Sequence, residues 1–102
     1  NVMCVNNMQI HYCEIAGGPA IGGIGLDSAS AYVANTSISN CGRAITVIYN
    51  SLLTARGVGG AGNQIGYSAH SSILNITGSS LQATTLTEKR NGGIIYKDGV
   101  LV

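Results

Sequence analysis

VNNMQIHYC at residues 5–13 and VANTSISNC at residues 33–41 share a common sequence pattern. Sliding the first stretch onto the second aligns a valine, an asparagine, an isoleucine and a cysteine. Recurrence at a spacing of about 20 to 50 residues is typical of folds that stack one structural unit on the next. The pair therefore predicts an architecture of stacked turns.

The composition agrees with close stacking of small residues. The chain has 102 residues, which is room for one domain. Only 9% of them are charged, against about 25% in a typical soluble domain. Fifteen glycines, with neither tryptophan nor phenylalanine, argue against a helical bundle and against an aromatic-centred sandwich.

The charge excludes two classes of partner. A net charge of +1 gives no broad field for nucleic acid or acidic lipid, so we expect neither. The sequence has no run of about 18 apolar residues that would span a membrane, so we do not expect membrane insertion. The start at Asn1, without an initiator methionine or a signal-peptide pattern, suggests a processed product or a piece of a longer protein.

The three cysteines, Cys4, Cys13 and Cys41, cannot all pair within one chain. We expect buried, reduced thiols. The alignment of the two stretches places Cys13 and Cys41 on successive turns, with backbones about 4.8 Å apart. That distance permits a disulfide without requiring one.

The repeat continues with shorter turns, at residues 1–19, 20–43, 44–63 and 64–85. Within turns, apolar residues alternate in short runs such as AITVI and SILNI, which indicates strands, and glycine-rich segments separate these runs. Inward residues of successive turns should stack in ladders. The predicted ladder is Val5, Val33, Leu53 and Leu74, with Ile10, Ile38 and Val58 beside it. A second series of repeat positions consists of Ile21, Ile45 and Ile65.

These features predict an all-β fold, a right-handed parallel β-helix of about four short turns. An irregular antiparallel β-sandwich is the alternative. Asparagine tolerates left-handed backbone geometry, and its amide can bond a neighbouring turn, so several asparagines are expected at the corners between strands. They are Asn35, Asn40, Asn50, Asn63 and Asn75.

The composition of the sequence changes from Leu86 onward: five of the nine charged residues lie between positions 88 and 98. The ending GGIIYKDGVLV reads as strand, Asp-Gly turn and strand, which predicts a tight hairpin. We therefore divide the chain into β-helix turns at residues 1–85 and a C-terminal hairpin cap and oligomerisation segment at residues 86–102.

The turn GNQIGYSAHSSILNITGSSLQATT, with the preceding NCGRAITVIYNSLLTARGV, resembles right-handed β-helix proteins of the pectin-lyase-like type. The low charge and the ending NGGIIYKDGVLV look like bacteriophage tailspikes and tail fibres. The resemblance implies a homotrimer in the virion tail, extracellular after assembly in the bacterial cytoplasm. Spikes of this kind typically bind, and often cleave, bacterial surface polysaccharide.

Chemistry-bearing residues are few. Glycoside cleavage commonly uses two carboxylates about 5 Å or about 6.5 to 9.5 Å apart. Before the tail the only acids are Glu14 and Asp27, with Arg43 available to orient a substrate. A simpler role follows from the alignment of the two stretches, which puts Glu14 over Gly42 and predicts a surface ion pair with Arg43.

A polysaccharide lyase would instead use a base and cations, for which Arg43, Arg56, His11 and His70 are available. Four acidic residues in all are too few for a dedicated calcium site, and no spacing suits zinc. The spacing Gly-x-Gly-x-x-Gly at residues 57–62 lacks the helix of a dinucleotide site. We expect no metal and no cofactor.

Tyrosines are the clearest surface signal, because a narrow coil has little room for five of them. Tyr49 and Tyr67 lie on adjoining predicted turns and, with Arg43 and Arg56, are candidates to bind glycan. Burial of these tyrosines between subunits is an equal alternative.

Three functions remain open at this point. The first is a structural and receptor-binding segment without catalytic residues of its own, and the second is an endoglycosidase or polysaccharide lyase. The third, a secreted repetitive adhesin, would carry glycan at Asn35 or Asn75, each of which begins an Asn-x-Thr/Ser sequence.

Overall fold

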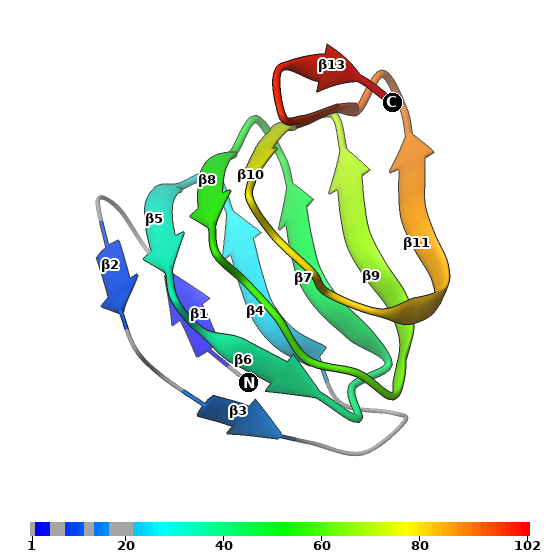
Figure 1. Cartoon of the computed structure of the whole chain (residues 1–102). Coiled ribbons are helices and arrows are strands. Elements are labelled where there is room, and N and C mark those ends of the chain that lie inside the picture. Colours follow the sequence, from blue (N-terminus) through cyan, green and yellow to red (C-terminus); the bar gives the residue numbers. More distant parts are fainter. Residues whose placement is uncertain (1, 5–7, 12–13, 17–21) are drawn as a thin grey trace.

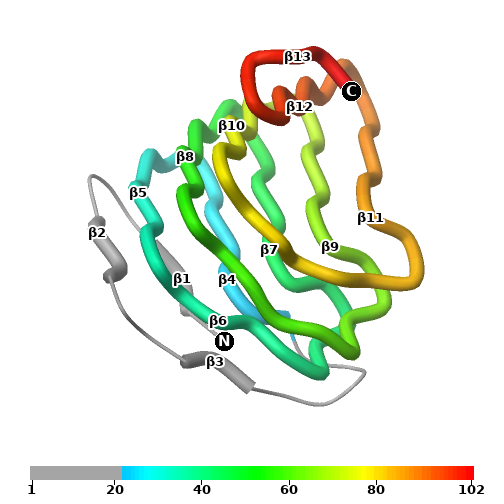
Figure 2. Tube along the Cα trace, in the orientation of Figure 1, coloured from blue at the N-terminus to red at the C-terminus, as the bar shows by residue number. Residues whose placement is uncertain are grey.

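The chain winds into a parallel β-solenoid of about four turns (Figure 1). The computed structural model describes residues 2–4, 8–11, 14–16 and 22–102, with side chains from Gly22 onward. Strands of successive turns lie side by side, and the path of the chain in Figure 2 follows the same coil. The prediction of a parallel β-helix is therefore confirmed over the β-sandwich. The described ranges contain no helix long and apolar enough to cross a membrane.

Three sheets form the walls of the coil, and we call them sheets A, B and C. Sheet A has five parallel strands in the order β1, β4, β7, β9 and β11. Sheet B has six strands in the order β13, β12, β10, β8, β5 and β2, and sheet C pairs β3 with β6. Sheet A comprises β1 Val2–Cys4, β4 Gly22–Asp27, β7 Arg43–Ile48, β9 Asn63–His70 and β11 Ala83–Arg90. Sheet B comprises β2 Met8–His11, β5 Ser30–Ala34, β8 Leu52–Arg56, β10 Ile73–Thr77, β12 Ile94–Lys97 and β13 Val100–Leu101, and sheet C comprises β3 Glu14–Ala16 and β6 Ser37–Ser39.

The sheet A strands begin at Gly22, Arg43, Asn63 and Ala83, close to the turn boundaries that the sequence predicts. Their inward residues form a continuous buried ladder of Ile24, Ile45 and Tyr67. Alternation of apolar and polar residues produces this ladder, because successive side chains of a strand point to opposite faces.

The predicted register of sheet B is only partly right. Leu53 does lie beside Leu74, as expected. Val33, however, pairs with Ala55 rather than with Leu53, and its neighbour on the preceding turn is Ile10. The step from Ile10 to Val33 is shorter than the step from Val5 to Val33, so the alignment that suggested the repeat is not the structural one. Val5 lies outside the described residues.

The residues expected beside this ladder, and the second series of repeat positions, do not align as predicted either. Ile38 pairs with Ile15 in sheet C, and the next turn meets sheet C through a bridge between Ser37 and Gly59, so Val58 is not its partner. Ile65 pairs with Arg43, not with Ile45. Ile21 lies outside the described residues. Matching letters misled the alignment, because similar apolar residues recur throughout the chain.

Asparagines occupy the corners as expected, with one exception. Asn35, Asn40 and Asn50 have φ values of 50°, 58° and 61°, in the left-handed region that asparagine tolerates. Asn75 instead lies in the middle of β10 and is exposed, so its placement at a corner is wrong.

The buried amide of Asn63 links neighbouring turns. Its Nδ2 donates to the carbonyl oxygens of Ile38 at 3.0 Å and Gln82 at 3.2 Å. Its Oδ1 accepts from the backbone N–H of Cys41 at 3.1 Å. Cys41 is a buried free thiol whose pKa is raised by desolvation. Cys13 lies outside the described residues.

The C-terminal hairpin is confirmed. β12 and β13 pair antiparallel, and the two loop residues Asp98 and Gly99 have φ values of 51° and 80°, as a tight Asp-Gly turn requires. β12 also pairs in parallel with β10, and β11 crosses the boundary placed after residue 85. Residues 83–97 thus form a last turn of the coil, and only β13 folds back against it.

Candidate functional site

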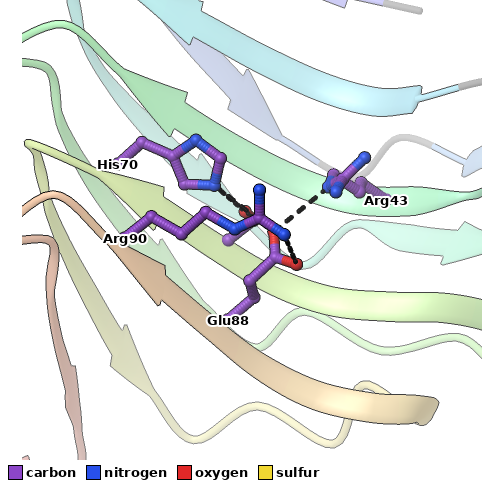
Figure 3. Close-up of polar contacts among 5 residues, drawn as sticks. Arg43, His70, Glu88 and Arg90 are labelled. Atoms are coloured by element: carbon purple, nitrogen blue, oxygen red, sulfur yellow. Dashed lines mark hydrogen bonds and ion pairs between the residues drawn. The ribbon is translucent and has the colours of Figure 1, made fainter.

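The outer face of sheet A carries a group of polar and charged side chains that we call the Glu88 cluster. It consists of Arg43 from β7, Ser68 and His70 from β9, and Glu88 and Arg90 from β11. The parallel register places Glu88 beside Ser68 and Arg90 beside His70. Winding of the coil therefore brings together residues from three successive turns, as Figure 3 shows.

Four side chains contact the Glu88 carboxylate. Oε1 accepts from Ser68 Oγ at 2.9 Å, and it lies 3.3 Å from both Arg43 Nε and His70 Nε2. Oε2 lies 3.4 Å from Arg90 Nη2. The Glu88 side chain is only 17% exposed, so the contacts form where water competes weakly.

These contacts set the ionisation of Glu88. Partial burial acts to raise its pKa, but hydrogen bonds from Ser68, His70 and Arg43, with the Arg43 charge, lower it from 4.5 to about 2. A general acid needs a pKa near the working pH. Glu88 is ionised at neutral pH and is not such an acid.

Serine, histidine and glutamate meet here, but not as a catalytic triad. Ser68 Oγ and Glu88 Oε1 both contact the same ring nitrogen, Nε2 of His70, at 3.0 and 3.3 Å. In a triad the acid holds one ring nitrogen while the other receives the serine proton. The Ser68 side chain is also fully buried. The contacts therefore stabilise the carboxylate rather than activate a nucleophile.

The cluster has an excess of positive charge, because two guanidinium groups surround one carboxylate. Each arginine uses a single nitrogen, Nε of Arg43 and Nη2 of Arg90, to bond Glu88. Within the described part of the chain, their other N–H groups have no recorded protein acceptor, and both side chains are well exposed. Guanidinium groups in this state bind carboxylate or phosphate oxygens well.

A depression of about 150 Å³ adjoins the cluster at the corner between sheets A and B, and we call it the Tyr49 corner. Tyr49 itself is 64% exposed and has a φ of 55°. A bulky residue in left-handed backbone is uncommon, and such strain gathers at functional sites. The corner is lined by Ile48, Tyr49, His70, Ser71 and Asn91.

A second depression, of about 290 Å³, lies on the sheet B side of the same corner. Leu52 and Ile73 give it an exposed apolar wall. The remaining lining residues are Asn50, Ser51, Ser71, Ser72 and Gly92.

The predicted glycan-binding residues are placed unequally. Tyr49 is exposed and Arg43 belongs to the Glu88 cluster. Tyr67 is only 1% exposed and forms part of the core, so a stripe of Tyr49 and Tyr67 on the surface is wrong. Arg56 ends β8 in sheet B, with Ala34 and Thr77 as its strand neighbours, so it is not brought to Arg43.

The predicted carboxylate pair lies on two different sheets. Glu14 begins β3 and pairs with Ser37 in sheet C, so its alignment over Gly42 is wrong. Asp27 ends β4 in sheet A, where it accepts a hydrogen bond from Ser28 Oγ at 3.1 Å. The side chain of Glu14 lies outside the described set, and the acid beside Arg43 is Glu88.

Sequence reasoning missed Ser68, Glu88 and Arg90. The signal was present, because Ser68 and Glu88 stand at the same position of successive turns, as do His70 and Arg90. Assigning the charged tail to a separate segment hid this match.

No group of three or more histidine, cysteine, aspartate or glutamate side chains suited to a metal ion occurs among the residues that the structure describes. Comparisons of the chain with protein-family models, with curated proteins and with solved structures found no match. The assignment that follows from the geometry is one of fold: the chain is a parallel β-solenoid of about four turns.

Proposed function

We propose that this chain is a structural and receptor-binding segment of a bacteriophage tailspike or tail fibre, and that it attaches to bacterial surface polysaccharide. The observation that carries the proposal is the exposed side chain of Tyr49 at the edge of a depression that His70, Ser71 and Asn91 also line. The parallel coil supports it, since stacked turns make a stiff scaffold with long flat faces.

The corner offers both kinds of contact that a sugar needs. The face of Tyr49 can pack against the C–H groups of a sugar ring, and its hydroxyl is a hydrogen-bonding group. His70, Ser71 and Asn91 add donors and acceptors from the neighbouring turns.

Backbone hydrogen bonds hold the corner in place. The N–H of Asn50 donates to the Ser71 carbonyl at 3.0 Å, and the N–H of Ser71 donates to the Arg90 carbonyl at 3.1 Å. Ser71 Oγ donates to the Asn91 carbonyl at 2.8 Å. A site fixed before binding loses little conformational freedom when the ligand arrives.

The alternative function, an endoglycosidase or polysaccharide lyase, requires a protonated carboxylic acid or a free base. Glu88 supplies neither, because its pKa is about 2 and both of its oxygens accept hydrogen bonds. We therefore propose attachment without cleavage by the Glu88 cluster.

The test is binding of the purified chain to capsular polysaccharides and lipopolysaccharides from a panel of bacteria. We expect at least one glycan to bind, and Tyr49→Ala to weaken that binding about tenfold. Tyr96→Ala, on the outer side of sheet B, is the matched control and should leave binding unchanged. Absence of binding across the panel, or oligosaccharide released from the glycan that binds, would contradict the proposal.

A further inference from the structure

The Glu88 cluster and the Tyr49 corner are continuous. Ile48, His70 and Arg90 are neighbours in one outward row of sheet A, and His70 also lines the corner. Tyr49 follows Ile48 directly in the chain. Two strand spacings, about 10 Å, separate the backbones of Ile48 and Arg90. A ligand longer than one sugar ring would therefore contact the tyrosine and the arginines together.

This surface carries a net positive charge. Glu88 cancels one of the two arginine charges, which leaves one positive charge in excess. Asp27, at the far end of the same row, lies three strands from Arg90, roughly 14 Å away along the sheet. At that distance an exposed acid is largely screened at physiological salt.

From this geometry we infer that the site binds an acidic sugar. Its carboxylate bonds the guanidinium nitrogens of Arg43 and Arg90 that Glu88 leaves available, and an adjoining sugar ring packs on Tyr49. The inference deepens the proposed function and rests on it. Glu88 has two opposed effects: its oxygens hold both guanidinium groups on one side of the sheet (Figure 3), and its negative charge competes with the ligand's carboxylate for them.

A single carboxylate matches the site better than the alternatives. A neutral glycan would leave the guanidinium groups without a charged partner, although charge-assisted hydrogen bonds are about twice as strong as neutral ones. A densely sulfated chain would bring several charges to a surface with one in excess. A carboxylated polysaccharide, with one acid in each repeat, fits both the charge and the tyrosine.

The experiment uses matched probes in calorimetry on the intact chain. The probes are a hyaluronan hexasaccharide and an oligosialic acid, each compared with its carboxyl-reduced derivative, in which a primary alcohol replaces every carboxylate. We expect at least one acidic probe to bind, and its reduced form to bind about tenfold more weakly. Equal binding of the two forms, no binding of either acid, or tighter binding of dextran sulfate would overturn the inference.

Variants separate charge from structure. Arg90→Gln and Arg43→Gln should each weaken binding of the acidic probe about tenfold, and Arg56→Gln on sheet B should not. Glu88→Gln keeps one side-chain oxygen that can accept from a guanidinium group and removes the negative charge that competes with the ligand's carboxylate, so it should strengthen binding several-fold. A purely structural cluster predicts the same sign for Arg90→Gln and Glu88→Gln, and that result would count against the site.

The two proposals fail differently. A neutral bacterial polysaccharide that binds through Tyr49, with no effect of the arginine variants, would retain the attachment function and overturn the acidic-sugar site. Loss of every glycan interaction would overturn both.

Discussion

At the scale of single residues, Glu88 makes folding depend on pH. Its pKa is about 2 in the folded chain, below the usual 4.5, so the folded state favours the ionised carboxylate. The stabilisation is present in full above about pH 4.5 and is lost as the pH falls toward 2. Allowing for solvent screening, we expect it to be worth about 1 to 2 kcal/mol.

Glu88→Gln should accordingly lower the free energy of unfolding by about 1 to 2 kcal/mol at pH 7 and by almost nothing at pH 2. Urea denaturation at several pH values measures the difference. Asp27→Asn is the control, because Asp27 is exposed and its one recorded contact, within the described residues, is with the adjacent Ser28. A constant difference between wild type and Glu88→Gln at all pH values would contradict the assignment.

Tyr67 provides a second residue-level test. Its hydroxyl is buried and has no hydrogen-bond partner in the described part of the chain. Burial raises the pKa of Tyr67, while the nearby Ser79 acts to lower it. A buried hydroxyl without a partner costs about 1 to 3 kcal/mol.

We therefore expect Tyr67→Phe to be at least as stable as wild type, with a gain of about 1 kcal/mol and a Tm higher by about 4 °C. Tyr67→Ala, which leaves a cavity, should cost about 3 to 5 kcal/mol. Thermal unfolding followed by circular dichroism distinguishes them. A lower Tm for Tyr67→Phe would mean that the hydroxyl does bond a partner, and Ser79, whose side chain lowers the pKa of Tyr67, is the candidate.

At the scale of the element, adjacent residues of β8 have opposite environments. Leu53 is completely buried between Ala31 and Leu74, whereas Leu52 is 44% exposed on the outer face. Leu53→Asp places an unpaired charge in the core and should cost several kcal/mol. Leu52→Asp should change stability by less than about 0.5 kcal/mol.

Soluble expression and the urea midpoint of the two variants check the prediction. Both variants replace a leucine of β8 by aspartate, so they differ only in whether the side chain points outward or inward. Similar midpoints for both variants would show that β8 does not present these faces.

The strands show what the sequence could predict. Short alternating runs, glycine-rich corners and the Asp-Gly turn located the strands and the turn boundaries, because each is a local signal. Register depends on contacts between turns, and a shift of one residue reverses every side chain of a strand. Letter matching placed Leu53 beside Val33, two residues from its true neighbour Ala31, and a shift of two residues keeps the same side chains inward, so the apolar alternation could not reveal it.

The candidate site was partly predictable for the same reason. Tyr49 and Arg43 could be named as candidate binding residues from the sequence, because the chain has few aromatic and few cationic residues. The ionisation of Glu88 depends on Ser68 and His70 one turn away, and that proximity requires the register of β9 against β11. Tyr67 was misplaced since alternation alone does not tell which face of a strand is inward.

At the scale of the whole molecule, the coil ends in polar residues. The inward ladder of Ile45 and Tyr67 continues to Thr87, and the neighbouring ladder of Ala69 continues to Lys89. Lys89 Nζ donates to the backbone oxygen of Val102. A charged residue at an inward position of an edge strand, as Lys89 is, disfavours pairing with a further strand. We infer that another copy does not stack end to end on β11.

The hairpin gives the last turn a different surface. Val100 and Leu101 are 63% and 61% exposed, and Val102, which bonds back to Ile95 through its N–H at 3.0 Å, is also exposed. Apolar side chains gathered at one end of a molecule mark an interaction surface. We propose that they pack around a rotation axis in a homotrimer, since closed symmetry ends assembly without leaving a free edge.

Light scattering on the purified chain is the test, with a trimer expected at three times the chain mass of 10.4 kDa. A version ending at Gly99 should be monomeric. Because that truncation also removes the contact of Lys89 with Val102, the double variant Val100→Ser, Leu101→Ser is needed as well; it keeps the backbone and removes only apolar surface. It should dissociate the trimer while its circular dichroism spectrum stays unchanged. A monomeric wild type, or a double variant that remains trimeric, would show that subunits do not meet through β13.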